Sequence, residues 1–160
     1  MKKIAGLLAV LGLAGLLTVG AATPALADRS VRDATVADLY IRDADPSLDA
    51  IAAQFAALWN PNLPMSAKQE VSYHGSTVGP ALQGILSQGG VYDFLSIQER
   101  ATSKNITGNT MTATLSGVMA GFPATSGSYS YIREDGLWKV DWKATCEAMG
   151  GCTGNPDFGY

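Results

Sequence analysis

The sequence predicts an α+β domain in which two or three N-terminal helices pack on one face of a four-stranded antiparallel meander. Two changes of pattern predict this class. Apolar residues recur at helical spacing between residues 45 and 88, and they then alternate with polar residues between residues 94 and 143. Turns that contain glycine separate the alternating segments, as hairpins between strands require. The chain of 160 residues is long enough for one domain with one core.

The first predicted helix begins at Asp45, which can cap it, and places Pro46 in its first turn. It ends at Asn60, because a residue that precedes proline avoids helical backbone angles. A capping box from Ser66 to Gln69 predicts a second, short helix that reaches about residue 73. A third helix is predicted from Ser76 to the Gly89-Gly90 pair. The apolar stripe of the first helix contains Leu48, Ile51, Ala52, Phe55, Leu58 and Trp59.

From about residue 94 the apolar residues no longer recur at helical spacing and instead occupy every second position. The predicted strands cover 94–103, 110–119, 128–132 and 137–143. In the last of them Trp138, Val140 and Trp142 share one face, and their apolar character predicts that this face is buried. The first helix is expected to cover that face through residues such as Ile51 and Phe55.

The first 27 residues have the three-part plan of a secretory signal. Lys2 and Lys3 precede an apolar run, and Ala25-Leu26-Ala27 forms a small-residue cleavage site before Asp28. The alternative is a membrane anchor, but the run is about 16 residues long, shorter than the roughly 20 that span a bilayer. We therefore expect a signal peptide over 1–27, cleavage between Ala27 and Asp28, export by the general secretory route, and no membrane span in the mature protein.

Three further segments follow the leader. Residues 28–45 mix aspartate with arginine and are predicted to form a polar, loosely held arm. Residues 46–152 are assigned to the α+β domain, and residues 153–160 to a C-terminal tail. Cys146 and Cys152 flank a loop of five residues with two glycines, and an exported chain with two cysteines is expected to pair them. The alternative, a redox-active pair, normally has two intervening residues.

Several short segments resemble a known family. They are Asn60-Pro61-Asn62, Ser66-Ala67-Lys68, Asn105-Ile106, Thr112-Ala113-Thr114 and the stretch from Tyr131 to Val140 with its acidic turn, glycine, tryptophan and lysine. In this order they resemble the mycobacterial low-molecular-weight secreted antigen family, the group of the twelve-kilodalton antigen, over about residues 48–146. The resemblance implies a secreted actinobacterial protein of unassigned biochemical function with a cystatin-like or NTF2-like fold. It supplies no catalytic residues, and the chain departs from the family in its arm and its tail.

The aromatic and sulfur-bearing residues of the predicted core could also line a cavity for an apolar ligand. The candidate lining residues are Phe55, Met111, Tyr131, Trp138 and Trp142. The alternative is that these side chains simply fill the core.

Two groups of residues could carry acid–base chemistry. His74 lies four residues after Glu70 and could act as a general base, or it could be a surface residue near a helix end. Asp93 or Glu99 could face a pocket with Tyr129 and Tyr131 as donors, or the tyrosines could be packing residues.

Composition narrows the function further. Without Lys2 and Lys3 the chain has 9 basic and 14 acidic residues, which argues against a nucleic-acid partner. One histidine and two cysteines leave no basis for a zinc or iron–sulfur site, so we expect no metal and no cofactor. We expect a secreted, non-enzymatic, antigen-like protein that binds a small apolar ligand or a partner in the cell envelope. The alternative is a small acid–base enzyme with an NTF2-like, cone-shaped pocket.

Overall fold

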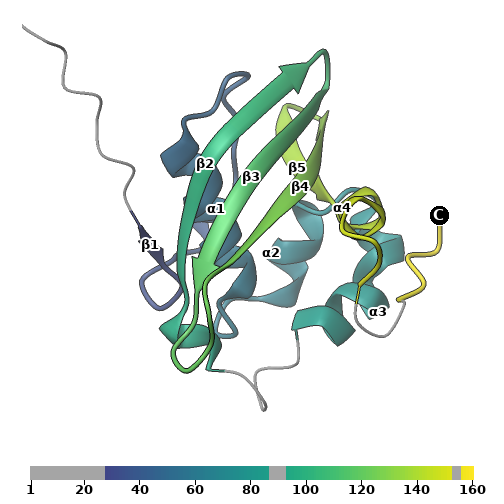
Figure 1. Cartoon of the computed structure of the whole chain (residues 1–160). Helices are drawn as coiled ribbons and strands as arrows, with labels where there is room; N and C mark the ends of the chain where they lie inside the picture. The colour runs from purple at the N-terminus through teal and green to yellow at the C-terminus, as the bar shows by residue number, and fades with distance from the viewer. Residues whose placement is uncertain (1–27, 87–92, 153–155) are drawn as a thin grey trace, which may run out of the picture.

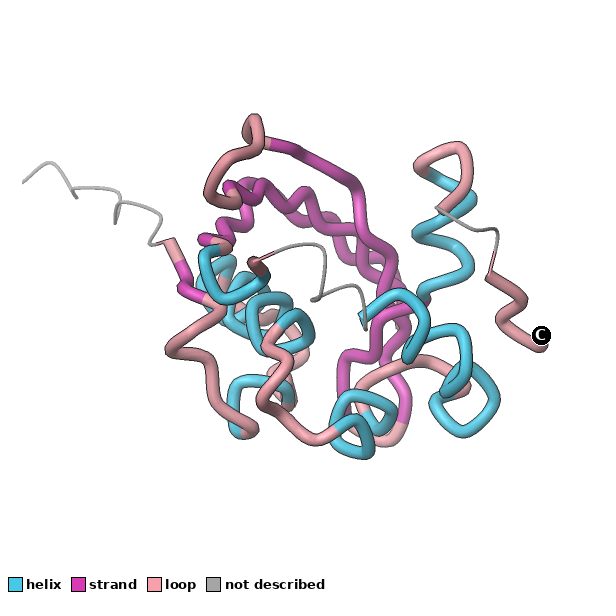
Figure 2. Tube along the Cα trace, turned by 90° about the horizontal axis from the view of Figure 1, so that it is seen from below, coloured by secondary structure: helices cyan, strands magenta, loops and turns pink. Residues whose placement is uncertain are grey.

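The computed structural model describes residues 28–86, 93–152 and 156–160. A curled, five-stranded antiparallel sheet arches over the helices that lie on its concave side (Figure 1, Figure 2). The strands, which are neighbours in chain order, are β1 (Arg29–Ser30), β2 (Gln98–Thr107), β3 (Thr110–Val118), β4 (Thr125–Glu134) and β5 (Leu137–Asp141). The helices are α1 (Leu48–Trp59), α2 (Met65–Glu70), α3 (Gly75–Leu86) and α4 (Trp142–Ala148), with short 3-10 turns η1 (Ala37–Leu39) and η3 (Phe94–Ser96). The α+β class is confirmed, and the predicted leader 1–27 lies outside the described residues.

The sheet has five strands rather than the predicted four, because the segment 28–45 supplies β1. Arg29 pairs with Glu99 of β2, and Val31, Leu39 and Ile41 are buried. The segment therefore packs against the domain instead of being loosely held. Its apolar residues are few and lack a period, and each enters the core at a separate place, which is why the pattern resembled a solvated arm.

Helix α1 begins later than predicted. Its N-cap is Ser47, whose hydroxyl accepts a hydrogen bond of 3.1 Å from the Ala50 amide, while Asp45 pairs with Lys104 of β2. The helix ends at Asn60, before Pro61, as predicted. Ile51 and Phe55 are buried on its sheet-facing side, which confirms that the predicted stripe covers the concave face.

A buried polar chain positions α2 between α1 and α4. Lys68 is almost completely buried, and its ammonium group donates a hydrogen bond of 2.6 Å to the Asn60 carbonyl at the end of α1. The Ser72 hydroxyl donates to the Lys68 carbonyl and accepts a bond of 3.0 Å from the Trp142 indole. Burial lowers the pKa of Lys68 to about 8. Asn60 and Lys68 lie in two of the motifs that carried the family resemblance, and the hydrogen bond between them gives both motifs a structural role.

The boundaries of α2 and α3 differ from the prediction, since α2 ends at Glu70 rather than near residue 73 and α3 begins at Gly75 rather than Ser76. Helix α2 begins at Met65 after Pro64, and no side chain caps it, so the expected capping box from Ser66 is absent. Helix α3 begins at Gly75, where a Cβ atom would lie 1.8 Å from the Gln69 carbonyl oxygen, so only glycine fits. The predicted end of α3 at Gly89 lies outside the described residues.

The strands show the predicted alternation of buried and exposed residues, but their first and last residues differ from the predicted ones. Residues 94–96 form the turn η3, and β2 begins only at Gln98. In β3, Met111, Ala113 and Leu115 are buried and alternate with exposed or partly exposed residues, as predicted. Both central residues of the β4–β5 turn, Asp135 and Gly136, have positive φ, as a tight hairpin turn requires.

The last predicted strand divides into a strand and a helix. Trp138 and Val140 of β5 are buried as predicted, but the strand ends at Asp141, which caps α4 by accepting a hydrogen bond of 3.0 Å from the Ala144 amide. Trp142 is also buried, from the first turn of α4. The period-two pattern continues across this boundary by coincidence of spacing, and therefore hides the helix.

The predicted Cys146–Cys152 disulfide is present, with Cα atoms 5.0 Å apart, and it ties the end of α4 to the chain that follows. In the predicted tail, Phe158 is buried and the Tyr160 hydroxyl donates a hydrogen bond of 2.8 Å to Asp141. Residues 153–155 lie outside the described part of the chain.

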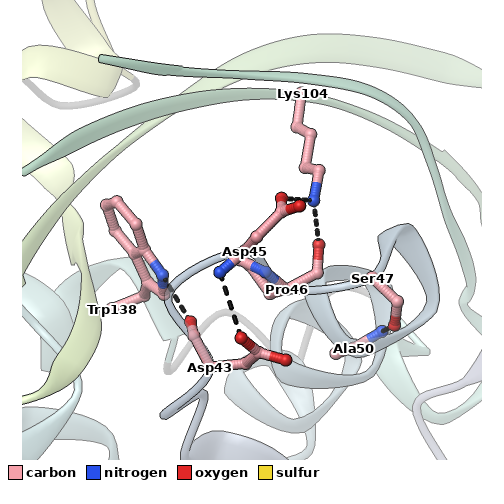
Figure 3. A network of polar contacts seen from close by, with 7 residues as sticks. All are labelled: Asp43, Asp45, Pro46, Ser47, Ala50, Lys104 and Trp138. Carbon is pink, nitrogen blue, oxygen red and sulfur yellow. Dashed lines mark hydrogen bonds and ion pairs between the residues drawn. The ribbon is translucent and has the colours of Figure 1, made fainter. Parts of the chain in front are cut away.

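One end of the concave face is closed by polar contacts (Figure 3). The Trp138 indole donates a hydrogen bond of 2.9 Å to the Asp43 carbonyl, and the Asp45 amide donates to the Asp43 carboxylate. Lys104 reaches from β2 to the Asp45 carboxylate and the Pro46 carbonyl. These contacts tie the segment before α1 to both β2 and β5, and we call this region the closed end.

Candidate functional site

The other end of the concave face holds a cavity of about 520 Å³. Its walls come from the sheet, α1, α3, α4, η3 and the loop between β3 and β4. We call this region the open end. The volume lies in the range of small-molecule sites in proteins, which are concave and mostly apolar. Six aromatic residues line the cavity: Phe55, Trp59, Phe94, Phe122, Tyr129 and Trp142.

Four of these rings form a continuous series from the sheet to η3. The Tyr129 and Phe55 ring centroids are 4.3 Å apart, and those of Phe55 and Trp59 are 6.0 Å apart. Trp59 then contacts Phe94 at 5.2 Å. These rings form one wall of the cavity. Because Phe55 of α1 is itself buried, the core fixes the position of this wall.

One acidic side chain, Glu99 of β2, lies in this wall. It is only 5% exposed, and none of the described residues gives its carboxyl group a hydrogen bond or an ion pair. Gly117 of β3 lies directly opposite it, and a Cβ atom there would be 3.0 Å from a Glu99 oxygen. The absence of a side chain at Gly117 therefore gives the carboxyl group its space.

The cation nearest to Glu99 in the sheet pairs elsewhere. Arg29 of β1 is the cross-strand partner of Glu99, but its guanidinium forms a bidentate ion pair with Asp49 of α1. Burial without a counter-charge raises the pKa of Glu99 to about 8. At pH 7 this carboxyl group is mostly protonated, and it can donate a hydrogen bond into the cavity.

The two tyrosines weighed with Glu99 have different positions. Tyr129 lines the cavity, and burial together with the nearby Glu99 raises its pKa to about 12. Tyr131 is fully buried in the core, where its hydroxyl has no partner among the described residues, and burial raises its pKa still further. Asp93 is exposed and lies outside the cavity wall. The structure thus brings Glu99 and Tyr129 together in the cavity wall, places Tyr131 in the core close to both, and leaves Asp93 outside the wall.

His74 is also distant from this site. Its ring lies between those of Tyr73 and Tyr160, at centroid distances of 4.0 and 4.4 Å, and it does not line the cavity. Glu70 accepts a hydrogen bond of 2.7 Å from the Tyr40 hydroxyl. The sequence pair Glu70 and His74 therefore does not form part of the candidate site.

The predicted cavity-lining residues divide between the two ends. Phe55 and Trp142 line the cavity, whereas Met111, Tyr131 and Trp138 are buried in the core and do not line it. Alternation along a strand predicts which face a residue occupies, but it gives no position along the curled sheet. The rings of Trp59 and Phe94 were assigned to the core stripe or to a strand, and no sequence signal marked them as cavity residues.

The rim of the cavity is apolar and uncharged. Val118, Phe122 and Met149 line it and remain 49%, 48% and 44% exposed. The sequence has no charged residue between Lys104 and Arg133, a stretch that includes β3 and the β3–β4 loop. An apolar molecule would therefore enter the cavity past an apolar edge.

Residues 28–86, 93–152 and 156–160 contain no cluster of three or more potential metal ligands. Over the same ranges, no helix has the length and apolar character needed to cross a bilayer.

Comparison with known proteins gives one match. Residues 44–156, well over half of the chain, match the family model described as low molecular weight antigen MTB12, C-terminal domain. No curated protein and no solved structure matches the chain. The chain therefore belongs to the family of low molecular weight antigens of the MTB12 type.

Proposed function

We propose that this protein is an exported binding protein for a small apolar molecule, and that the open end is its binding site. One observation carries the proposal: a cavity of about 520 Å³ with mostly apolar walls lies against the hydrophobic core at the open end. Unfilled apolar volume weakens a fold, because its lining loses packing contacts. A ligand that fills the space would restore those contacts.

Export is part of the proposal. The leader 1–27 has the plan of a cleaved secretory signal, and the disulfide between Cys146 and Cys152 supports an oxidising compartment. We propose that the exported chain begins at Asp28, with no membrane span, and acts outside the cell. An intact-mass measurement on protein from culture fluid tests this, since retention of Met1 would contradict cleavage before Asp28.

The shape of the site favours one of the two fold types that the resemblance implied. The sheet is curled and has helices on its concave side (Figure 2). Together with a cavity at one end, this is the arrangement expected of a cone-shaped, NTF2-like pocket. We therefore place the NTF2-like fold above the cystatin-like fold as the working assignment.

The binding proposal is tested with an uncharged apolar dye, Nile red, whose fluorescence rises when it leaves water. We expect saturable binding to the intact protein, and we expect Thr125→Trp to abolish it by filling the cavity from an exposed position in its wall. Thr112→Trp is the matched control, because Thr112 is exposed on β3 and does not line the cavity. Equal binding by both variants, or no binding by the intact protein, would contradict the proposal.

A second candidate function is acid–base catalysis at the same site. Glu99 supports it, because a carboxyl group with a pKa of about 8 beside a tyrosine in an apolar cavity is suited to proton transfer near neutral pH. The test is exchange of the α-hydrogens of cyclohexanone for deuterium, followed by NMR. Catalysed exchange that Glu99→Gln removes would favour the enzyme, and exchange at the uncatalysed rate would favour the binding protein.

A further inference from the structure

The residues of the open end disfavour anionic ligands. Among the described residues that line the cavity, Glu99 is the sole acidic one, and none is lysine, arginine or histidine. A carboxylate or phosphate group would find no cation there, and it would face the Glu99 carboxyl group. The acidic excess of the chain, 14 acidic residues against 11 basic, also favours the approach of cations over anions.

The rings beside Glu99 favour a cation for a second reason. The face of an aromatic ring carries partial negative charge and attracts ammonium groups, most strongly where water is excluded. Tyr129, whose pKa the charge of Glu99 also raises, begins the series of rings that continues through Phe55 to Trp59. A buried carboxyl group beside such rings is a suitable surrounding for an amine with an apolar body.

We infer that the ligand of the open end is an apolar organic amine, bound with its ammonium group against Glu99 and its hydrocarbon part against the aromatic wall. This inference rests on the proposed function, because it assumes that the cavity is a ligand site. It also explains the residue opposite Glu99: Gly117 leaves the carboxyl group room to face the cavity.

Binding of the amine requires a proton to leave the site. At pH 7 Glu99 is mostly a neutral acid, since its pKa is about 8. When an ammonium ion binds, the carboxyl O–H bond breaks, the proton passes to the solvent buffer, and the carboxylate pairs with the ammonium ion. The other titratable groups that face Glu99 are Tyr129 and Tyr131 of β4, which remain neutral at this pH, and Arg29 of β1, which is paired with Asp49.

The experiment compares three decyl compounds that differ only in their polar group: decylamine, decanol and decanoate, each below its micelle concentration. Calorimetric titration at pH 7 in buffers of different ionisation enthalpy measures both affinity and proton release. We expect decylamine to bind at least about tenfold more tightly than decanol, with decanoate weakest. We also expect release of about one proton per decylamine bound and none for decanol.

Two variants separate the role of Glu99 from a general change in the fold. Glu99→Gln is expected to lose both the preference for decylamine over decanol and the proton release. Glu134→Gln makes the same chemical change at an exposed position in the β4–β5 hairpin and is expected to behave as the unmodified protein.

The outcomes distinguish this inference from the proposed function. If decanol binds as tightly as decylamine, or decylamine binds without proton release, the amine inference is overturned while the cavity remains a ligand site. If none of the three compounds binds, the proposed function fails as well.

Discussion

The closed and open ends of the concave sheet contain similar types of residue, but these residues have different surroundings. At the closed end, Trp138 is completely buried and its indole is hydrogen bonded, and Lys104 is paired with Asp45. At the open end, Trp59 and Trp142 line a cavity, and the buried Glu99 has no partner among the described residues. Aromatic content therefore does not distinguish the two ends, whereas the cavity and a buried acid that no described residue pairs with do.

This difference indicates that stability and ligand binding depend on opposite ends of the domain. The closed end supplies the packing that stabilises the fold, and the open end carries groups that weaken the fold and suit a ligand. Functional sites commonly retain such unfavourable features, which the rest of the structure offsets. The predictions below test this division, from the largest expected effect to the smallest.

The largest effect is expected at the closed end, from Trp138→Ala. The substitution removes a fully buried indole and its hydrogen bond to Asp43, and should lower the free energy of unfolding by about 3–5 kcal/mol. Urea denaturation measures the loss. Lys139→Ala, on the neighbouring residue, removes ion pairs with exposed acids and some packing of the lysine's hydrocarbon part, and should cost clearly less than Trp138→Ala. Similar costs for the two variants would contradict a closed end built around Trp138.

The next effect is a stabilisation at the open end, from Glu99→Gln. The folded protein holds a proton on Glu99 up to a pKa of about 8, whereas the unfolded chain releases it near 4.5. The folded state therefore binds more protons between these values, and its stability falls as the pH rises through that window. At pH 9 the glutamine variant should be more stable than the unmodified protein by up to roughly 5 kcal/mol.

Thermal or urea denaturation between pH 5 and pH 9 checks this prediction. The stability difference should be small at pH 5, grow toward pH 8 and then level off. Glu134→Gln, at an exposed site, should show no such trend. A glutamine variant that stays less stable than the unmodified protein at pH 9 would mean that Glu99 is ionised and paired in the folded state.

A smaller effect is expected from removing the disulfide with Cys146→Ser and Cys152→Ser together. The bond closes a short loop, so its loss should cost about 2 kcal/mol. Because Cys152 lines the cavity and Met149 forms part of the rim, the same change should also weaken Nile red binding. Unchanged dye binding after loss of the bond would show that α4 holds the cavity wall without it.

The smallest effect is expected from Tyr131→Phe in the core. Its buried hydroxyl has no partner among the described residues, so removing the oxygen should change the free energy of unfolding by less than about 1 kcal/mol and could not be strongly destabilising. A large loss, measured by urea denaturation, would show that a buried water bonds this hydroxyl. The comparison with Glu99→Gln separates an unpaired neutral group from an unpaired acid.

Much of the fold could be predicted from the sequence because local signals agreed. The stripe of α1, the alternation in β3 and the turn at Asp135-Gly136 each depend on residues close in the chain. The strand β1 and the helix α4 were missed for a physical reason. The two residues of β1 form a strand only because they pair with the edge of β2. Helix α4 begins inside a stretch whose apolar and polar residues alternate as they do in a strand.

The candidate site was harder to predict than the fold. The inward faces of Phe55 and Trp142 followed from period and stripe, but a cavity is unfilled volume, and that depends on the curl of the sheet and on several elements at once. Glu99 shares its predicted strand face with Leu95 and Ile97, but the pattern left an inward and an edge position equally open. Arg29, its partner on the neighbouring strand, pairs instead with Asp49 of α1, and no local pattern contains this interaction between distant segments.

The most direct test of the division between the two ends is an amide NMR titration with decanol. The account predicts that shifts concentrate at the open end, around Gly117, Val118, Tyr129 and Met149, while the amides of Met111, Tyr131 and Trp138 at the closed end stay unchanged. Shifts centred on the closed end, or no saturable shifts at any amide, would contradict the claim that the protein reserves its open end for an apolar ligand.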